Sequence, residues 1–262
     1  MIEVDIELIK NIIKKGKRID NRDFEKYREI IIEQGIISSA EGSAKVKIGD
    51  TEVIAGVKMD VGEPYPDSPD EGVITVSAEF VPLASPEFEA GPPGEDAIEL
   101  ARVVDRAIRE SKAIDFKKLC ITPKEKVWMI FVDLDILNDD GNLIDASGLA
   151  TIVALLNTRI PELTEDGKPN YEKRVEKLPI NGIPISTTFV KIDNTIIADP
   201  NLAESKSMNA RLTVGTVDKD DKIMICSLQK GGPDGLSMED IDKIIDLSIK
   251  KGEEFRNLIR SL

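Results

Sequence analysis

The chain has 262 residues, which is enough for one large domain or two small ones with a sizeable core. Charged residues make up 32 % and hydrophobic residues 41 %, as in a globular protein and unlike a disordered one. The lack of histidine excludes Ser-His-Asp and Cys-His nucleophile systems, histidine general bases and histidine-ligated zinc. A net charge of −14 disfavours nonspecific nucleic-acid binding, so any such contact needs a local basic patch or a partner.

Two cysteines, Cys120 and Cys226, are too few for a Cys₄ metal site or a disulfide framework, and we expect two buried cytosolic thiols. No apolar run approaches the roughly 18 residues of a membrane span. Residues 1–15 mix acidic and basic side chains with isoleucine, which is unlike a secretory signal. We therefore expect the chain to act in the cytoplasm, without membrane contact.

The first third of the chain predicts a short helix followed by strands. Apolar residues at helical spacing indicate an amphipathic helix over residues 3–15, and a charged connector follows it. A hairpin turn is predicted at Gly49 and Asp50, and proline-rich loops at 62–72 and 85–94. Strands are predicted near residues 27–37, 43–49, 51–60 and 72–81.

The rest of the chain predicts helices, a second group of strands and a last helix. Helices are expected over residues 95–113 and near 145–158, on either side of an alternating strand at 126–137. Residues 161–179 are polar, and we expect them to be irregular. Ser237 and Asp240 form a capping box that opens a final helix to about residue 259. The second group of strands is predicted at residues 185–193, 194–199, 208–217 and 222–229.

The order of several strands and then a helix occurs twice. It predicts an α+β fold of mixed or antiparallel sheets, with helices packed on one side. No linker is long enough to separate two independent domains. We therefore predict a single domain over residues 1–262, with two sub-halves at roughly 25–160 and 180–262, preceded by the helix at 3–15.

An arginine stripe lies on the helix predicted at residues 95–113. Arg102, Arg106 and Arg109 stand at positions i, i+4 and i+7, so they share one face of the helix. Three aligned guanidinium groups suit a phosphodiester backbone, because each can clamp phosphate oxygens bidentately. The alternative is a solvated helix face with local ion pairs, such as Arg106 with Glu110.

An acidic cluster begins in the strand predicted at 126–137 and continues into the turn and helix that follow it. Dense carboxylates could bind Mg²⁺, but their spacing does not match an EF-hand loop. Turn formation and helix capping explain the last three of them adequately. We therefore predict no metal site at these residues, which are Asp133, Asp135, Asp139, Asp140 and Asp145.

Two further segments could carry chemistry. Residues 231–235 are rich in glycine and precede a helix, but no Lys-Ser or Lys-Thr pair follows, so a plain turn and cap is predicted instead of a P-loop. Residues 199–204 end a strand and hold Asp199 and Glu204, which could act as an acid or a metal ligand. A simple turn is the alternative for this second segment.

Several runs of the sequence resemble the RNase PH family. The resemblance covers nearly the whole chain, and it implies an α+β fold of two similar halves. It also implies a family that phosphorolyses RNA from the 3′ end and assembles into six-domain rings. The runs that carry it are residues 16–22 (GKRIDNR), 42–51 (GSAKVKIGDT), 140–146 (DGNLIDA), 199–204 (DPNLAE) and 227–232 (SLQKGG).

Within this family the sequence is most similar to the non-catalytic ring subunits of archaeal exosomes. The characteristic runs are residues 88–106 and 138–146. This similarity implies a hexameric ring in which the chain alternates with a catalytic RNase PH-like sister subunit, three of each. It further implies RNA-binding cap subunits and single-stranded RNA as partners, and no cofactor of its own.

The sequence departs from active members of the family at two positions. Active members place Gly-Thr-Arg at a helix start, where the arginine and helix N–H groups hold the attacking phosphate. This chain has Asn142, Leu143 and Ile144 there. Active members also carry a second aspartate six residues after the first, and here Asp199 is followed by Ser205.

We therefore predict no catalytic residue in this chain and no enzyme activity of its own. The predicted role is a scaffold that completes the active site of the catalytic partner and contacts RNA during 3′-to-5′ degradation. Arg102, Arg106 and then Arg109 are the predicted RNA contacts. The alternatives are a phosphorolytic exoribonuclease that is active alone and a small-molecule enzyme on a related fold.

Overall fold

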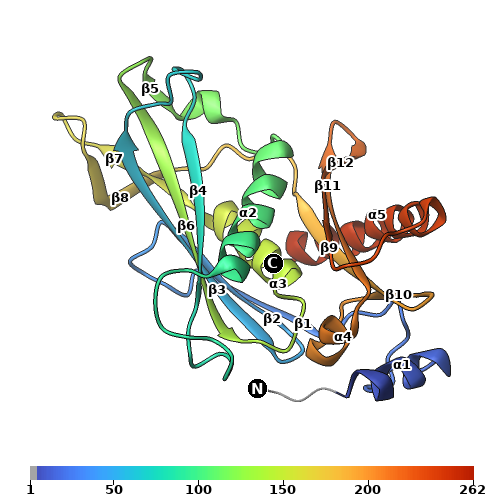
Figure 1. Ribbon diagram of the computed structural model, residues 1–262. Helices are drawn as coiled ribbons and strands as arrows, with labels where there is room; N and C mark the ends of the chain where they lie inside the picture. Colours follow the sequence, from blue (N-terminus) through green and yellow to red (C-terminus); the bar gives the residue numbers. More distant parts are fainter. Residues whose placement is uncertain (1–4) are drawn as a thin grey trace.

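Two large β-sheets frame the protein, with two helices between them and one long helix outside, as Figure 1 shows. The computed structural model describes residues 5–262. The predicted α+β class with mixed and antiparallel sheets is confirmed.

The first sheet buries every second side chain on one face. In β3 (Thr51–Gly62), Val53, Ala55 and Val57 are fully buried, while the residues between them are half-exposed. Neighbouring strands are antiparallel, except that β4 runs parallel to β6. The strand order is β1 (Ile30–Gln34), β2 (Gly42–Ile48), β3, β6 (Lys126–Asn138) and β4 (Val73–Phe80), with the short β5 (Cys120–Thr122) paired to β6.

Helices α2 (Glu95–Glu110) and α3 (Leu143–Asn157) pack on the buried face of the first sheet. α3 is apolar around its whole circumference because it is buried between the two sheets. α2 buries Leu100, Val104 and Ile108 and leaves its other side in solvent. A 3₁₀ turn, η1 (Phe116–Leu119), leads from α2 into β5.

The second sheet has helices on both faces. Thr188 donates to Asp145 of α3, whereas Lys191 pairs with Asp240 of α5 (Met238–Arg260). Residues three apart in a strand point to opposite faces, so α3 and α5 cover opposite sides of the sheet. The predicted capping box of Ser237 and Asp240 opens α5. The antiparallel strand order is β10 (Thr195–Ala198), β9 (Ile185–Ile192), β11 (Ala210–Lys219) and β12 (Lys222–Gly231).

Two short helices pack against the second sheet. The predicted N-terminal helix is α1 (Ile6–Lys14), and residues 3 and 4 of its predicted range lie outside the described residues. Ile9 and Ile13 of α1 pack on Val190 and Ile197 of the second sheet. α4 (Leu202–Ser207) follows β10. Among residues 5–262, no helix is both long enough and apolar enough to cross a membrane.

The expectation that residues 161–179 are irregular is wrong. β7 (Arg159–Leu163) and β8 (Pro169–Lys177) pair as an antiparallel hairpin with two register shifts. Most side chains of β8 are exposed on both faces, so its sequence lacks the alternation of a half-buried strand.

Arg18 joins the segment after α1 to the second half. Its buried guanidinium donates to both carboxylate oxygens of Glu204, at 2.8 and 2.5 Å. It also donates to the carbonyl oxygens of Ala198 and Asp199, at 3.0 and 2.8 Å. Glu204 is buried and accepts from the backbone N–H of Asn201, so Arg18 is the counter-charge that makes its burial tolerable.

Replacing Arg18 by Met strands the charge of Glu204 in the interior. We expect Arg18→Met to lower the free energy of unfolding by about 3–5 kcal/mol, measured by urea denaturation. The double variant Arg18→Met/Glu204→Gln removes the stranded charge and keeps an acceptor for the cap of α4, so it should recover part of the loss. A single variant within about 1 kcal/mol of the wild type would contradict this assignment.

Candidate functional site

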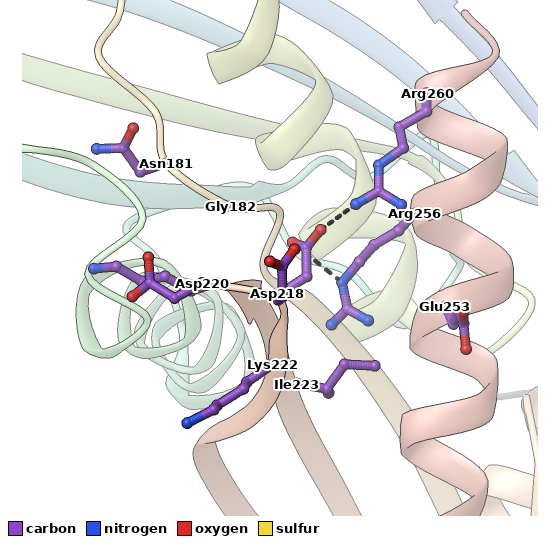
Figure 2. Close-up of a pocket in the computed structure, with 11 residues that line it drawn as sticks. Asn181, Gly182, Asp218, Asp220, Lys222, Ile223, Glu253, Arg256 and Arg260 are labelled. Carbon is purple, nitrogen blue, oxygen red and sulfur yellow. Dashed lines mark hydrogen bonds and ion pairs between the residues drawn. The ribbon is translucent and has the colours of Figure 1, made fainter.

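A hollow of about 700 Å³ lies where the β11–β12 turn approaches α5. Figure 2 shows Arg256 and Arg260 of α5 turned toward Asp218 of β11. Buried Arg256 also donates to the carbonyl of Ile183 at 3.0 Å and to the hydroxyl of Thr216 at 2.7 Å. The acidic and basic residues that line the hollow balance in number, and these contacts tie α5 to the sheet. We therefore interpret this hollow as part of the frame.

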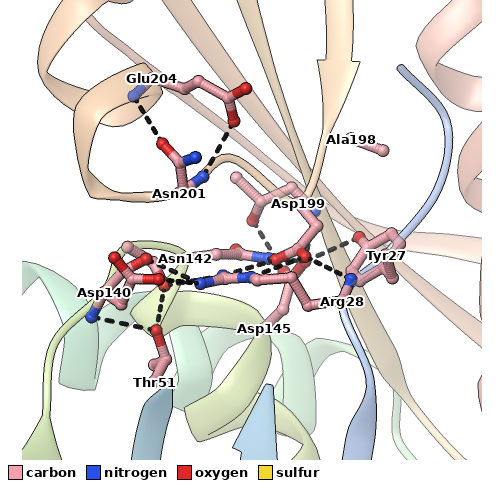
Figure 3. A network of polar contacts seen from close by, with 12 residues as sticks. Tyr27, Arg28, Thr51, Asp140, Asn142, Asp145, Ala198, Asp199, Asn201 and Glu204 are labelled. Atoms are coloured by element: carbon pink, nitrogen blue, oxygen red, sulfur yellow. Dashed lines mark hydrogen bonds and ion pairs between the residues drawn. The ribbon is translucent and has the colours of Figure 1, made fainter. Parts of the chain in front are cut away.

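A buried polar network centred on Asp199 lies where the two halves meet (Figure 3). Asp199 follows β10 with a positive φ of 47°. One carboxylate oxygen accepts from Arg22 Nη1 at 2.7 Å and from the backbone N–H and Nε of Arg28 at 2.8 and 2.9 Å. The other accepts from Arg28 Nη2 and Asn142 Nδ2, both at 2.8 Å. Five hydrogen bonds therefore occupy a carboxylate that has no exposed surface.

The ionised form of Asp199 is strongly favoured. Burial acts to raise the pKa of Asp199, but the hydrogen bonds and charge of Arg28 outweigh it and hold that pKa below its ordinary value. A carboxylate with a low pKa and no free lone pair facing solvent is poorly suited to donate a proton. In this structure Asp199 holds the two halves together.

Asn142 and Asp145 extend the network to the start of α3. Asn142 has left-handed backbone angles and donates through Nδ2 to Asp145 as well as Asp199, at 2.9 and 2.8 Å. The same Asp145 oxygen accepts from Tyr27 Oη at 2.8 Å and the backbone N–H of Thr188 at 2.9 Å. Its other oxygen accepts from Thr188 Oγ1 at 2.7 Å. Burial nevertheless raises the pKa of Asp145 to about 6, because these neutral donors offset only part of the lost hydration.

The structure brings together the two positions at which the sequence departs from active family members. Ile144 at the start of α3 and Ser205 of α4 both line a cavity of about 280 Å³. Ile144 is buried in the hydrophobic core. An aliphatic side chain cannot clamp a phosphate as arginine does. At position 205 a hydroxyl stands where the family resemblance implies a second carboxylate, as an acid or a Mg²⁺ ligand.

The charge of this cavity also disfavours an anion. Its two cations are already paired: Lys206 with Glu87 at 2.8 Å, and Arg211 with Glu99 at 2.5 Å. Burial raises the pKa of Asp139, which lines the cavity, even though the N–H of Gly141 donates to it. The remaining lining is largely apolar and comes from Phe80, Phe88, Leu100, Leu143, Ile144, Val190, Leu202 and Met208.

The predicted acidic cluster does not converge on one point. Asp135 lies on the solvent-facing side of β6, where burial and then the nearby Glu79 raise its pKa. Asp140 pairs with Arg28 at 3.1 Å, and Asp145 is buried in the first turn of α3. Within residues 5–262, no three carboxylate or thiol side chains are placed to hold a metal ion.

The predicted arginine stripe is exposed on one face of α2. Arg102 and Arg106 line a hollow of about 320 Å³ together with Gln229 of β12. Arg106 donates to Gln229 Oε1 at 3.4 Å, whereas the alternative interpretation of the stripe paired it with Glu110. Arg109 is paired with Asp105 at 2.7 Å, one turn back along the helix. The three arginines therefore share a face but differ in how far their charge is already neutralised.

Sequence reasoning missed the residues that organise the network. Arg18 and Arg22 lie in a run that carried the family resemblance, but nothing in their spacing gave them a role. Arg28 and Tyr27 stood in a region predicted as connector and strand. The useful signal was the three arginines Arg18, Arg22 and Arg28 in a connector without helical periodicity. Arginines that have no regular spacing along their own segment are candidates for ion pairs with residues far away in the sequence.

Comparison with known proteins gives a consistent family relationship. The patterns of the 3′ exoribonuclease family, domain 1 and domain 2, match residues 26–161 and 182–251. The exosome complex component Rrp42 of Thermococcus kodakarensis is 48 % identical over 251 residues, covering 95 % of this chain and 91 % of that protein. The Archaeoglobus fulgidus Rrp42 is 45 % identical, covering 100 % of this chain and 98 % of that protein.

Solved structures share the fold. A chain of the Archaeoglobus fulgidus exosome with RNA bound to the active site has a TM-score of 0.88 and 46 % identity, covering 96 % of both chains. Rice Rrp46 has a TM-score of 0.68 and 18 % identity, covering 93 % of this chain and 98 % of that chain, which is a likeness of fold alone.

The raised pKa of Asp145 predicts a pH dependence of stability with a definite sign. Its folded-state pKa of about 6 exceeds the ordinary 3.8, so the folded state holds the proton more tightly than the unfolded state. The stability contributed by that proton is complete below pH ~4 and is lost as the pH rises through about 6, a loss of about 3 kcal/mol.

Asp145→Asn removes this titration and can keep the contacts. The amide oxygen of the new asparagine would accept from Tyr27, Asn142 and the N–H of Thr188. Its NH₂ group would donate to Thr188 Oγ1. The hydroxyl proton of Thr188 would then be donated to Thr213 Oγ1, which lies 2.9 Å away. Urea denaturation across pH 4–7 should show wild type losing about 3 kcal/mol relative to the variant. A difference that does not change with pH would refute the assignment.

Proposed function

This chain belongs to the 3′ exoribonuclease (RNase PH) family, and on that premise we propose that it is a non-catalytic ring subunit of an exosome. The resemblance drawn from the sequence motifs is confirmed. In this proposal the chain scaffolds the ring, contacts RNA and completes the active site of a catalytic RNase PH-like partner during 3′-to-5′ RNA degradation.

The proposed assembly follows from the relatives. The curated relatives at 45–48 % identity are components of exosomes, and this chain covers nearly all of their length. We propose a hexameric ring with three copies of this chain alternating with three of the catalytic partner, carrying RNA-binding cap subunits and working in the cytoplasm. A structural relative belongs to an exosome with RNA in its active site, which supports a path for single-stranded RNA through the ring.

One observation carries the non-catalytic assignment: the cavity at the start of α3 cannot hold an attacking phosphate. Ile144 is in the core, Ser205 replaces a carboxylate, and the two cations of the cavity are paired with carboxylates. Asp199, the acid that remains, is fully engaged by Arg22, Arg28 and Asn142. Loss of a transition-state arginine alone lowers the rate by a factor of about 10³–10⁵, so an active site in this cavity would catalyse phosphorolysis very slowly.

The RNA contact is proposed on α2. Arg102 and Arg106 are exposed and stand one helical turn apart, about 6 Å along the axis. Neither is paired with a carboxylate within residues 5–262. Arg109 ranks below them, because Asp105 already holds its guanidinium. In a chain of net charge −14, this face is where a phosphate backbone would be attracted.

We expect the purified chain alone to release no nucleoside diphosphates from RNA in the presence of phosphate and Mg²⁺. The ring formed by co-expression with the catalytic partner should release them. A ring in which only the partner's aspartates are inactivated should be inactive as well. Product release by the lone chain, or by the ring with the inactivated partner, would establish the alternative of an independently active exoribonuclease.

The arginines should contribute unequally to RNA binding. Each phosphate contact to a single strand contributes about 0.7 to the slope of log K against log salt. Arg102→Ala/Arg106→Ala should therefore flatten the slope of the assembled ring by about 1.4, and adding Arg109→Ala should bring the total to at most about 2.

Arg109→Ala alone is the matched control on the same helix. It should change the slope least, since Asp105 already neutralises Arg109. RNA of different sequences should lose affinity to a similar extent, because phosphate contacts carry no base information. An unchanged slope for the double variant in an intact ring would move the RNA path to the partner.

A further inference from the structure

A carboxylate lines the same hollow as the proposed RNA contacts but forms its ion pair with a residue of another element. Glu99 precedes Arg102 by three residues on α2, a spacing at which glutamate and arginine form ion pairs on a helix surface. Glu99 instead accepts from Arg211 of β11, with 2.5 Å between Nη2 and Oε1. Within residues 5–262, Arg102 has no ion-pair partner.

Strand β12 makes room for this contact. Arg211 lies opposite Gly231 in the β11–β12 register, and Gln229 lies two residues before Gly231 on the same face of β12. A Cβ at position 231 would lie 2.8–3.0 Å from the guanidinium atoms of Arg211. The guanidinium therefore lies flat over the bare Cα of Gly231 and reaches across β12 to α2.

Among the described residues, the contact with Glu99 is the one hydrogen bond and ion pair of the Arg211 side chain. Arg211 Nε is buried and has no hydrogen-bond partner among the described residues. The side chain as a whole is largely buried, with 17 % of its surface exposed, against 41 % for Glu99. Removing Arg211 would thus leave Glu99 half in solvent, one turn from Arg102 and free to turn toward it.

We propose that Arg211 is a positioning residue for RNA binding, which sequesters Glu99 and leaves Arg102 free for phosphate. This proposal rests on the proposed RNA-binding role of α2. Gln229 likewise leaves the charge of Arg106 unneutralised, because the partner that it offers this arginine at 3.4 Å is a neutral amide oxygen. Adjacent strands of the second sheet thereby set the charge that α2 presents to RNA.

The test uses the ring assembled with its catalytic partner and measures binding of a single-stranded RNA over a salt series. Arg211→Met frees Glu99, so RNA affinity should fall about fivefold, and the salt slope should flatten by about 0.7. Gly231→Ala keeps every charge but displaces the guanidinium of Arg211, and it should have the same effect. Glu99→Gln in either background should restore wild-type binding.

Lys251→Met is the matched control, because it also removes a cation that is paired with a glutamate. Lys251 pairs with Glu254 of α5, and Arg211 pairs with Glu99 of α2. The control variant removes one positive charge elsewhere on the chain and should leave RNA binding unchanged. Arg102→Ala/Arg106→Ala, measured beside these variants, reports on the proposed function independently of Arg211.

These outcomes distinguish the proposed RNA contact on α2 from the proposed positioning role of Arg211. If the double arginine variant binds RNA as the wild type does, the proposed RNA contact on α2 fails and the RNA path moves to the partner. If that variant binds weakly while Arg211→Met and Gly231→Ala bind normally, the positioning role of Arg211 is overturned and the proposed function stands. Weak binding by Arg211→Met that Glu99→Gln does not restore would also overturn it, because Arg211 would then act by direct RNA contact or through the fold.

Discussion

The burial of one carboxylate, Asp199, is the constraint on which the arrangement of the two halves depends. An ionised carboxylate in the interior is tolerated only when its lone pairs are filled and its charge is balanced. Here the donors come from two other parts of the chain: the segment after α1 supplies Arg22 and Arg28, and the start of α3 supplies Asn142. Satisfying Asp199 therefore fixes the N-terminal segment, the first half and the second half relative to one another.

On the proposed non-catalytic role, the same constraint explains how the framework of the family can persist without catalysis. A residue that must hold the halves together cannot be lost, whatever happens to the chemistry around it. Ile144 and Ser205 do not connect the two halves in this way. Ile144 packs in the hydrophobic core, and Ser205 lines the cavity. Change is therefore expected where a group served only the reaction, and retention where it also served the fold. Removing Asp199 would leave the largely buried side chain of Arg28 without its main counter-charge.

The sequence predicts the sheets and long helices well because their signals are local. Alternation along β6 and the capping box at Ser237 each need only a few neighbouring residues. The β7–β8 hairpin was missed because exposed strands show no alternation. The Asp199 network was missed for a different reason: Arg28 donates to a carboxylate 171 residues away, and no local pattern records such a pairing. The family motifs located Asp199 and Ser205, but their physical states became evident only from the structure.

The exposed arginines show why net charge is a poor guide to binding. Charges in solvent are screened over about 8–10 Å at moderate salt, so most of the acidic surface has little influence on α2. The carboxylates that matter are those on the helix itself. Asp105 neutralises Arg109, whereas Glu99 is bound by Arg211. On the proposed RNA-binding role, the charge that α2 presents to RNA thus depends on which cation each nearby helix carboxylate has taken as its partner, and the packing of β11 and β12 decides that for Glu99.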